Sequence, residues 1–171
     1  MQPNTAERRR TAGELADMEL ELGYDLLGGR LRSIGEVELT YGRWGGRPRA
    51  LGPHPLEYDL LGSRLRRIGD VEIGYGRLSS VPRTFGTWDV DCAAWSGIPR
   101  QIGPYPVDHP RFSGRVRGIG PLSVEYDLLG GRPRRVVLPA GMHALPDDLL
   151  RVLFLVLHLQ TERNKSSSSA A

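Results

Sequence analysis

Residues Glu36 to Gly52 read EVELTYGRWGGRPRALG, and this stretch decides the fold because its pattern recurs along the chain. Val37, Leu39 and Tyr41 alternate with polar residues, which is the period-2 pattern of a strand with one wet face. A glycine-rich loop follows, and glycine tolerates the positive φ that a hairpin loop requires. A second short strand then leads to Gly52. The stretch therefore predicts one β-hairpin.

The same unit occurs seven times between residues 19 and 137, with a period of 17 residues. An arginine marks every copy, at Arg32, Arg49, Arg66, Arg83, Arg100, Arg117 and Arg134. A second position holds an aromatic residue or its replacement, at Tyr24, Tyr41, Tyr58, Tyr75, Cys92, His109 and Tyr126. Self-similarity at a fixed period indicates a repeat architecture.

Each copy has room for two strands and two turns but not for a crossover helix. Consecutive strands must therefore be antiparallel neighbours in a meander. Four copies carry a proline just before the repeated arginine, at positions 48, 82, 99 and 133. Because proline removes a backbone donor, the second strand of each copy is expected to be short or irregular there.

A C-terminal helix is predicted over 146–160. Pro146, Asp147 and Asp148 form a typical helix start. The helix is apolar nearly all round, so it must be enclosed instead of lying on a surface along one stripe. Residues 1–17 are expected to be a flexible or partly ordered arm, and the serine-rich residues 161–171 a disordered tail.

The sheet supplies the enclosure. Fourteen strands spaced about 4.8 Å apart and tilted about 40° would close into a barrel of roughly 14 Å radius, which accommodates a helix of about 10 to 12 Å diameter. The predicted fold is thus an all-β repeat: an antiparallel meander of seven hairpin units, strongly curled or closed like a barrel, wrapped around one C-terminal helix. The alternative is an open sheet whose helix is buried in a dimer.

The run Tyr-Asp-Leu-Leu-Gly occurs at 24–28, 58–62 and 126–130 and resembles the YD repeats of the Rhs family. Those hairpins likewise carry a Tyr-Asp pair, a glycine and an arginine. The hairpin-after-hairpin organisation also resembles MORN-type meanders. Both resemblances imply a scaffold or a binding surface, and neither implies catalytic residues.

The arginine column has two interpretations. Arginines spaced about 10 Å apart along one face would suit a nucleic-acid backbone. However, every copy also has a carboxylate one strand away, so cross-strand ion pairs are favoured and the column is interpreted as a structural ladder on the surface. Those carboxylates are Glu21, Glu38, Glu57, Glu72, Asp89 with Asp91, Asp108 and Glu125. The formal net charge of +3 is too small to imply a polyanion partner by itself.

The fifth and sixth copies depart most from the pattern, and their aromatic residues are the candidate partner or ligand patch. This patch comprises Trp88, Trp95, Tyr105 and His109. Cys92 and His109 lie one copy apart, about 10 Å, which is too far for a nucleophile and its base. No catalytic residues, cofactor-binding residues or metal ligands are expected.

The sequence favours a non-enzymatic repeat scaffold that binds another protein or itself. A glycan or small-ligand module that uses the patch aromatics is the alternative, and nucleic-acid binding through the arginine column is the third possibility. The only cysteine, Cys92, and the absence of an apolar run behind the N-terminal charges predict a cytoplasmic protein. No insertion into a membrane is expected, because the longest apolar stretch, 149–159, is interrupted by Arg151 and His158.

Overall fold

The computed structural model describes residues 17–27, 29–44, 46–60, 64–94, 96–110, 114–129 and 131–169. Within them the chain forms fourteen strands and then one helix. The strands of the first four hairpins are β1 (Glu19–Tyr24), β2 (Leu31–Ile34), β3 (Val37–Tyr41), β4 (Pro48–Leu51), β5 (His54–Tyr58), β6 (Leu65–Ile68), β7 (Val71–Tyr75) and β8 (Pro82–Phe85). The remaining elements are β9 (Trp88–Cys92), β10 (Pro99–Ile102), β11 (Tyr105–Asp108), β12 (Gly118–Ile119), β13 (Leu122–Tyr126), β14 (Pro133–Val137) and helix α2 (Asp147–Ser169).

The sheet is a closed antiparallel barrel in which every strand pairs with its neighbours in sequence. Pairing of β1 with β14 closes it, with Leu20 opposite Val136 and Glu21 opposite Arg135. Closure leaves no unpaired edge, which is the feature that makes a long meander prone to aggregation. The predicted all-β meander is confirmed, and its sheet is closed.

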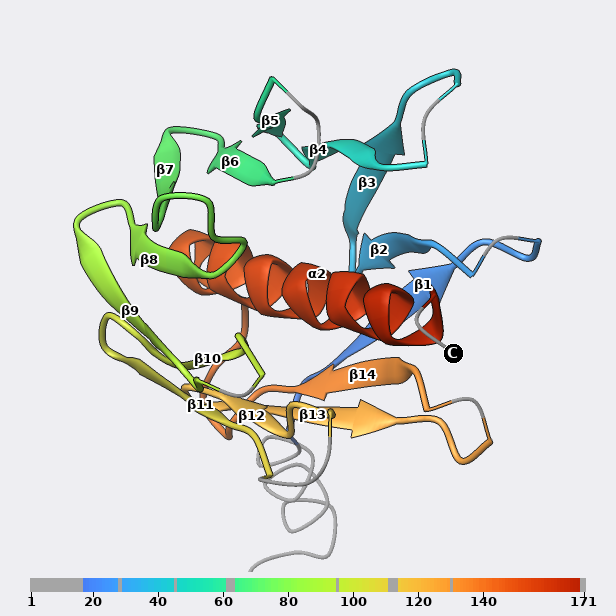
Figure 1. The fold of residues 1–171 in the computed structure, drawn as a ribbon. Helices are drawn as coiled ribbons and strands as arrows, with labels where there is room; N and C mark the ends of the chain where they lie inside the picture. The colour runs from blue at the N-terminus through green and yellow to red at the C-terminus, as the bar shows by residue number, and fades with distance from the viewer. Residues whose placement is uncertain are drawn as a thin grey trace, which may run out of the picture.

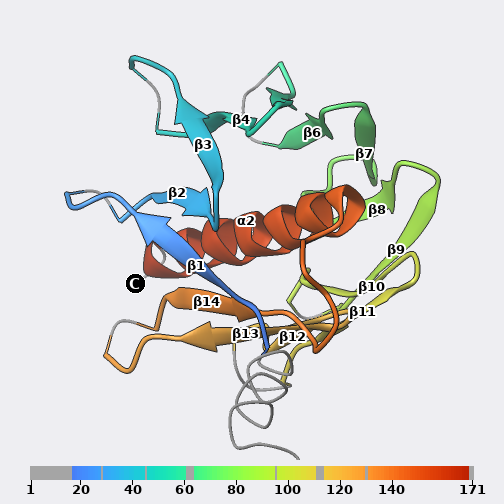
Figure 2. The same cartoon turned by 180° about the vertical axis from the view of Figure 1, so that it is seen from behind.

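Helix α2 runs through the barrel, enclosed by strands on all sides (Figures 1 and 2). Leu153 and Leu155 are completely buried, and they belong to the same hydrophobic cluster as inward-facing strand residues such as Leu51 and Ile68. Near the end of the buried part, the Val116 N–H donates to Gln160 Oε1 at 2.8 Å and ties the helix to the wall. The apolar side chains all round the helix are therefore buried within one chain.

The helix ends later than predicted. It continues to Ser169, so the expectation of a disordered tail is wrong for residues 161–169. Side chains of the tail bond back to the preceding turn: the Thr161 hydroxyl donates to the Leu157 carbonyl at 2.9 Å, and Lys165 pairs with Glu162 at 3.3 Å. Of the predicted N-terminal arm, residues 1–16 lie outside the described residues.

Tight turns join consecutive hairpins, and each turn contains a glycine whose φ lies in the left-handed region. The φ of Gly52, for example, is 55°, and its N–H donates to the carbonyl of Glu38 at 2.8 Å. The corresponding contacts recur from Gly35 to Gly120 along the array. This backbone bond extends the pairing of the two strands within each hairpin up to the turn.

Six hairpins contain an irregularity in the second strand, as predicted for the copies with prolines, and the β11–β12 pairing contains none. Tyr41 pairs with Pro48 and Thr40 pairs with Ala50, so Arg49 is left over as the extra residue of a β-bulge. The same shift of register places Arg32, Arg66, Arg83, Arg100 and Arg134 between paired residues. The repeated arginine is therefore the bulge residue in these six hairpins.

Candidate functional site at the loop end of the barrel

The barrel has two different ends. Short two-residue turns lie at one end, here called the turn end, together with the first turn of helix α2. The longer connections lie at the other, the loop end, together with the C-terminal half of the helix. These connections span 25–30, 42–47, 59–64, 76–81, 93–98, 109–117 and 127–132. The loop end holds the features that point to binding.

A ring of tyrosines lies at the base of the loops. The hydroxyl of each donates to a backbone carbonyl of the preceding hairpin, ten residues earlier, as in Tyr41 to Leu31 at 2.6 Å and Tyr58 to Pro48 at 2.8 Å. Tyr24 donates to the Pro133 carbonyl across the seam and so continues the ring between the first and last hairpins. Cys92 occupies the same position, with its Sγ 3.5 Å from the Pro82 carbonyl.

Arginines of a second column stack on these tyrosines. Arg47 lies over the ring of Tyr58, with its guanidinium carbon 4.3 Å from the centroid. The other stacks are Arg30 on Tyr41, Arg64 on Tyr75, Arg115 on Tyr126 and Arg132 on Tyr24. Where the sequence replaces the tyrosine by Cys92 or His109, the matching arginine is replaced by Val81 or Ile98. The two positions therefore change together within the chain, as expected for a cation–π pair.

The Tyr-Asp motif supplies the third member of this arrangement. Asp25 and Asp59 each accept a charge-assisted bond from an arginine Nε at 2.8 Å, from Arg30 and Arg64 respectively. The same carboxylates accept from the backbone N–H of those arginines, at 3.0 and 3.4 Å. Tyrosine, arginine and aspartate together give the loops a rigid base.

The ring should be visible in an alkaline titration. Burial is the main cause that raises the pKa of Tyr24 and Tyr75 from 10.0 to about 12. Since the folded pKa lies above the unfolded value, the stabilisation is fully present below pH 10.0 and is lost as the pH rises through about 12. We expect tyrosinate absorbance to appear together with loss of the far-UV circular dichroism signal. Titration of these residues near pH 10 in a folded protein would contradict the structure.

A cavity of about 710 Å³ opens at the loop end between the helix and the strands on either side of the seam. Phe154, Leu157 and Leu39 provide its apolar lining. Its charged lining consists of Arg30, Arg47, Arg132, Lys165 and Glu162. His158 also lines it; burial lowers the pKa of this histidine, so its ring is neutral at neutral pH. The cavity thus combines an apolar lining with a set of cations.

Large apolar side chains stand fully exposed on the loops. Their relative exposure is 94% for Trp44 and 100–103% for the leucines. The leucines are Leu26, Leu27, Leu60, Leu78, Leu128 and Leu129. The β1–β2, β3–β4 and β13–β14 loops, which carry five of these residues, project from the same side of the barrel as the end of helix α2 (Figures 1 and 2). Paired leucines are unusual in such loops, because turns favour glycine, proline and polar residues.

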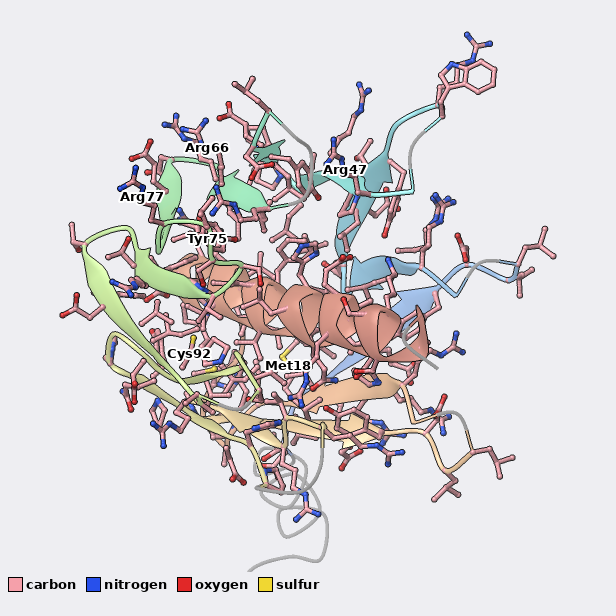
Figure 3. All side chains as sticks on the ribbon, viewed as in Figure 1. Met18, Arg47, Arg66, Tyr75, Arg77 and Cys92 are labelled. Atoms are coloured by element: carbon pink, nitrogen blue, oxygen red, sulfur yellow. The ribbon has the colours of Figure 1, made fainter. Side chains whose placement is uncertain are left out.

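Charge is distributed unevenly between the ends. The seven loops contain nine arginines and three aspartates, whereas the six tight turns contain two acids, Glu36 and Asp70, and no basic residue. The small net charge of +3 therefore conceals a basic loop end. Figure 3 shows Arg66 and Arg77 pointing away from the barrel, whereas Tyr75 and Cys92 lie on the side of the wall that faces the helix.

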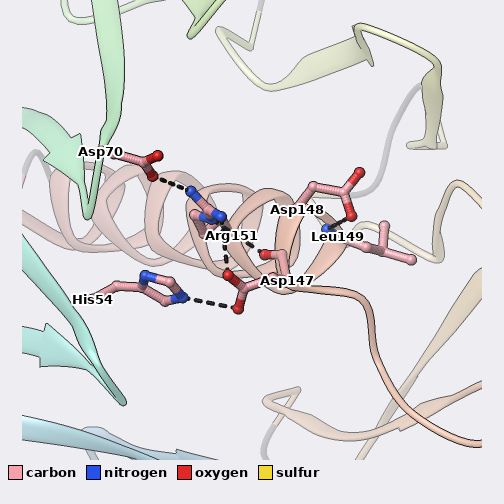
Figure 4. Close-up of polar contacts among 6 residues, drawn as sticks. All are labelled: His54, Asp70, Asp147, Asp148, Leu149 and Arg151. Carbon is pink, nitrogen blue, oxygen red and sulfur yellow. Dashed lines mark hydrogen bonds and ion pairs between the residues drawn. The ribbon is translucent and has the colours of Figure 1, made fainter.

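The turn end is occupied by structural contacts of the helix N-terminus (Figure 4). Asp147 lies 2.9 Å from His54 and 3.0 Å from Arg151, which in turn lies 2.6 Å from Asp70. The bond from His54 is the main cause that lowers the pKa of Asp147. A depressed pKa means that this carboxylate stabilises the fold above its ordinary pKa, and that the contribution is lost on acidification. The network attaches the helix to two successive turns.

Of the predicted patch, the structure brings Trp88 and Tyr105 together and places His109 apart from them. Trp88 and Tyr105 are in contact at the turn end, with ring centroids 5.8 Å apart, and the Tyr105 hydroxyl donates to Asp148 at 2.8 Å. His109 follows the opposite end of β11, at a position of the tyrosine ring. Trp95 lies outside the described residues. Cys92 takes a ring position as well, and burial raises the pKa of its thiol to about 11.

The predicted arginine ladder holds for one member of the column. Arg100 lies 3.6 Å from Asp91, and in the described part of the chain no other column arginine is within ion-pair distance of a carboxylate. In the third and seventh hairpins the next residue along the strand forms the cross-strand pairs instead: Arg67 lies 2.6 Å from Glu72 and 3.7 Å from Glu57, and Arg135 lies 2.9 Å from Glu19 and 3.4 Å from Glu125. The bulge is the reason, because it takes the column residue out of the paired register.

Comparison with known proteins gave no relative: no family model, curated protein or solved structure matches the chain. Among the residues with described positions, no cluster of three or more histidine, cysteine or acidic side chains is arranged to hold a metal ion. A search of the same residues for helices finds none long and apolar enough to cross a membrane. The proposal for function therefore rests on the geometry of the loop end.

Proposed function

We propose that the chain is a non-enzymatic binding scaffold that engages another molecule through the loop end. The observation that carries the proposal is the set of fully exposed apolar side chains at the loop tips. Burying a leucine side chain is worth about 1.5–3 kcal/mol, and these leucines gain none of it in the isolated barrel. Contact with a partner would supply it.

The loop end has a feature that is common in binding surfaces: variable loops are held on a rigid scaffold. The base of each intact loop is fixed by a tyrosine bonded to the preceding hairpin and by an arginine stacked on it, as for Tyr58 and Arg47. The barrel interior is already filled by helix α2, so the tip residues have no role in the core. Because the tip residues do not contribute to the core, this arrangement supports their role in contacting another molecule.

Site-specific photo-crosslinking in cells that make the chain tests the proposal. A photoreactive amino acid is placed at Leu27 or Leu128 on the loop end, and for comparison at Glu36 or Thr87, which are exposed at the turn end. We expect adducts from the first pair of positions and few from the second. Equal yields at both ends, or none at the loop end, would contradict a loop-end binding surface.

The cavity favours a second candidate function, the binding of a small anionic amphiphile. Its apolar lining from Phe154 and Leu157 would accept a hydrocarbon segment, and Arg47 at its edge would accept a carboxylate or phosphate. Thr161 lines the cavity and is exposed, so Thr161→Trp should narrow it without disturbing the core. We expect wild-type protein to bind decanoate in calorimetry and the variant to lose that heat. Equal binding by both proteins would exclude this cavity as the site.

A further inference from the structure

We propose that the partner of the loop end is the surface of an anionic lipid bilayer. This inference rests on the proposed function, because it names the class of molecule that the same surface contacts. The contact is made by five side chains on three loops, here called the apolar tips. The apolar tips are Leu26, Leu27, Trp44, Leu128 and Leu129.

The shape of the surface favours a bilayer. The β1–β2, β3–β4 and β13–β14 loops project as separate hairpins (Figure 1), and the apolar residues that they carry are 94–103% exposed. A protein partner would need a matching pocket for each tip, whereas the interfacial region of a bilayer accepts several apolar side chains at once. Tryptophan and leucine above cationic residues are the combination that peripheral membrane segments use.

The charge behind the apolar tips favours anionic lipid. Arg30, Arg47 and Arg132 lie at the bases of the same three loops, and Lys165 lies beside them on the helix. Three of these cations are balanced by nearby carboxylates, because Asp25 pairs with Arg30, Asp127 with Arg132 and Glu162 with Lys165, so the net positive charge comes from other arginines. Arg43 and the exposed bulge residues Arg32, Arg49 and Arg134 add positive charge on the adjoining strands. Basic residues near an anionic membrane surface strengthen binding by about fivefold each.

A second copy of the chain fits this surface less well. Two loop ends placed face to face would oppose their arginines. In a head-to-tail arrangement the apolar tips would meet the turn end, and in the described part of the chain the only exposed large apolar residue outside the loops is Met18, at 40% exposure. A nucleic acid is also disfavoured, because the apolar tips extend beyond the arginines that would contact phosphates.

The proposal departs from the expectation that no part of the chain enters a membrane. The contact is shallow: only loop tips enter the interfacial region, and the barrel stays outside it. The polar and charged outer wall, with exposed residues such as Glu57 and Glu72 on the strands, agrees with this position.

Vesicle flotation with the full chain tests the inference. We expect the protein to float with phosphatidylcholine vesicles that contain phosphatidylserine, and to bind much less to phosphatidylcholine alone or at high salt. A variant with serine at Leu26, Leu27, Leu128 and Leu129 should bind at least about a hundredfold more weakly. Its fold should be unchanged, because all four side chains are fully exposed. Met18→Ser is the matched control and should bind like wild type.

Trp44 provides an independent readout. Its emission should shift to the blue when phosphatidylserine vesicles are added, because the exposed indole enters a less polar medium, and Trp44→Phe should lose that change. Three results would each overturn the inference: no flotation of the folded chain, undiminished binding of the serine variant, or equal binding to phosphatidylcholine alone. Loop-end crosslinks to protein or RNA without vesicle binding would refute the lipid inference and leave the proposed function intact.

Discussion

A chain that ends at Leu138 will not form a stable barrel. The truncation removes helix α2, which contributes eight buried apolar side chains to the core, and leaves the inward-facing strand residues around an empty space. The eight are Leu149, Leu150, Val152, Leu153, Phe154, Leu155, Val156 and Leu157. At roughly 1.5–3 kcal/mol for each buried side chain, the loss is about 12–24 kcal/mol, which equals or exceeds the 5–15 kcal/mol by which a typical domain is stable.

The measurement is circular dichroism and light scattering on the truncated chain. A chain ending at Arg163 is the matched control, because it retains every buried helix residue and removes the polar end of the helix. We expect the control to be folded and monomeric, and the chain ending at Leu138 to be unfolded or aggregated. A folded monomer without the helix would show that the barrel has another core.

Gly103→Ala should destabilise the protein strongly. Gly103 has a φ of 52°, and a Cβ built there would overlap the indole of Trp88, which is itself packed between Phe85 and Tyr105. The left-handed backbone costs an alanine about 1–2 kcal/mol and the overlap about 1–3 kcal/mol more. Urea denaturation should therefore give a loss of roughly 2–5 kcal/mol with an unchanged slope.

Two alanine variants separate the causes. Gly52 has a similar φ of 55°, but the nearest atom to its added Cβ is the end of the Val37 side chain at 3.0 Å, so Gly52→Ala reports mainly the backbone strain. Gly46 has no atom within 4 Å of an added Cβ, and Gly46→Ala should change stability by less than about 0.5 kcal/mol. A Gly103→Ala protein as stable as the Gly46→Ala protein would contradict the turn geometry and the position of Trp88.

The repeat and its fold were predictable from the sequence because the relevant signals are local and recur. Alternation in segments such as Val37 to Tyr41 indicates strands, and the period excludes helical crossovers. The enclosed position of the helix was predictable because a helix that is apolar all round must be surrounded, and seven hairpins supply enough strands to surround it. The C-terminal end of the helix was not predictable from composition. Serine and threonine side chains from Thr161 onward donate hydrogen bonds to backbone carbonyls one turn earlier in the helix.

The pairing of the arginine column with carboxylates was the main error, and its cause is geometrical. Leu65 lies opposite Tyr58, so regular pairing of β5 with β6 would place Arg66 opposite Glu57. The extra residue at the bulge places Arg67 opposite Glu57 instead, and Arg67 forms the ion pairs. A single inserted residue reverses every inference about facing in the rest of a strand. The prolines indicated an irregularity, but they did not indicate which residue it removes from the register.

The candidate site was missed for a different reason. The tyrosine ring depends on how far each hairpin is staggered against the next, which places the Tyr58 hydroxyl on the Pro48 carbonyl; strand periodicity contains no such information. One signal was available in the sequence: arginine and tyrosine are lost together at Val81 with Cys92 and at Ile98 with His109. The exposed leucines were also visible as apolar residues in loops where polar ones are usual.

Closure of the barrel around its helix is tested most directly by a disulfide across the seam. Glu21 and Arg135 are directly opposite on β1 and β14, so their Cα atoms are about 4.5–5.5 Å apart, a distance that a disulfide spans. In a Cys92→Ser background, Glu21→Cys with Arg135→Cys should oxidise to an intramolecular bond in a monomer, read by gel mobility without reductant and by mass. An open sheet would place these residues at opposite edges, so free thiols or disulfide-linked dimers would contradict closure.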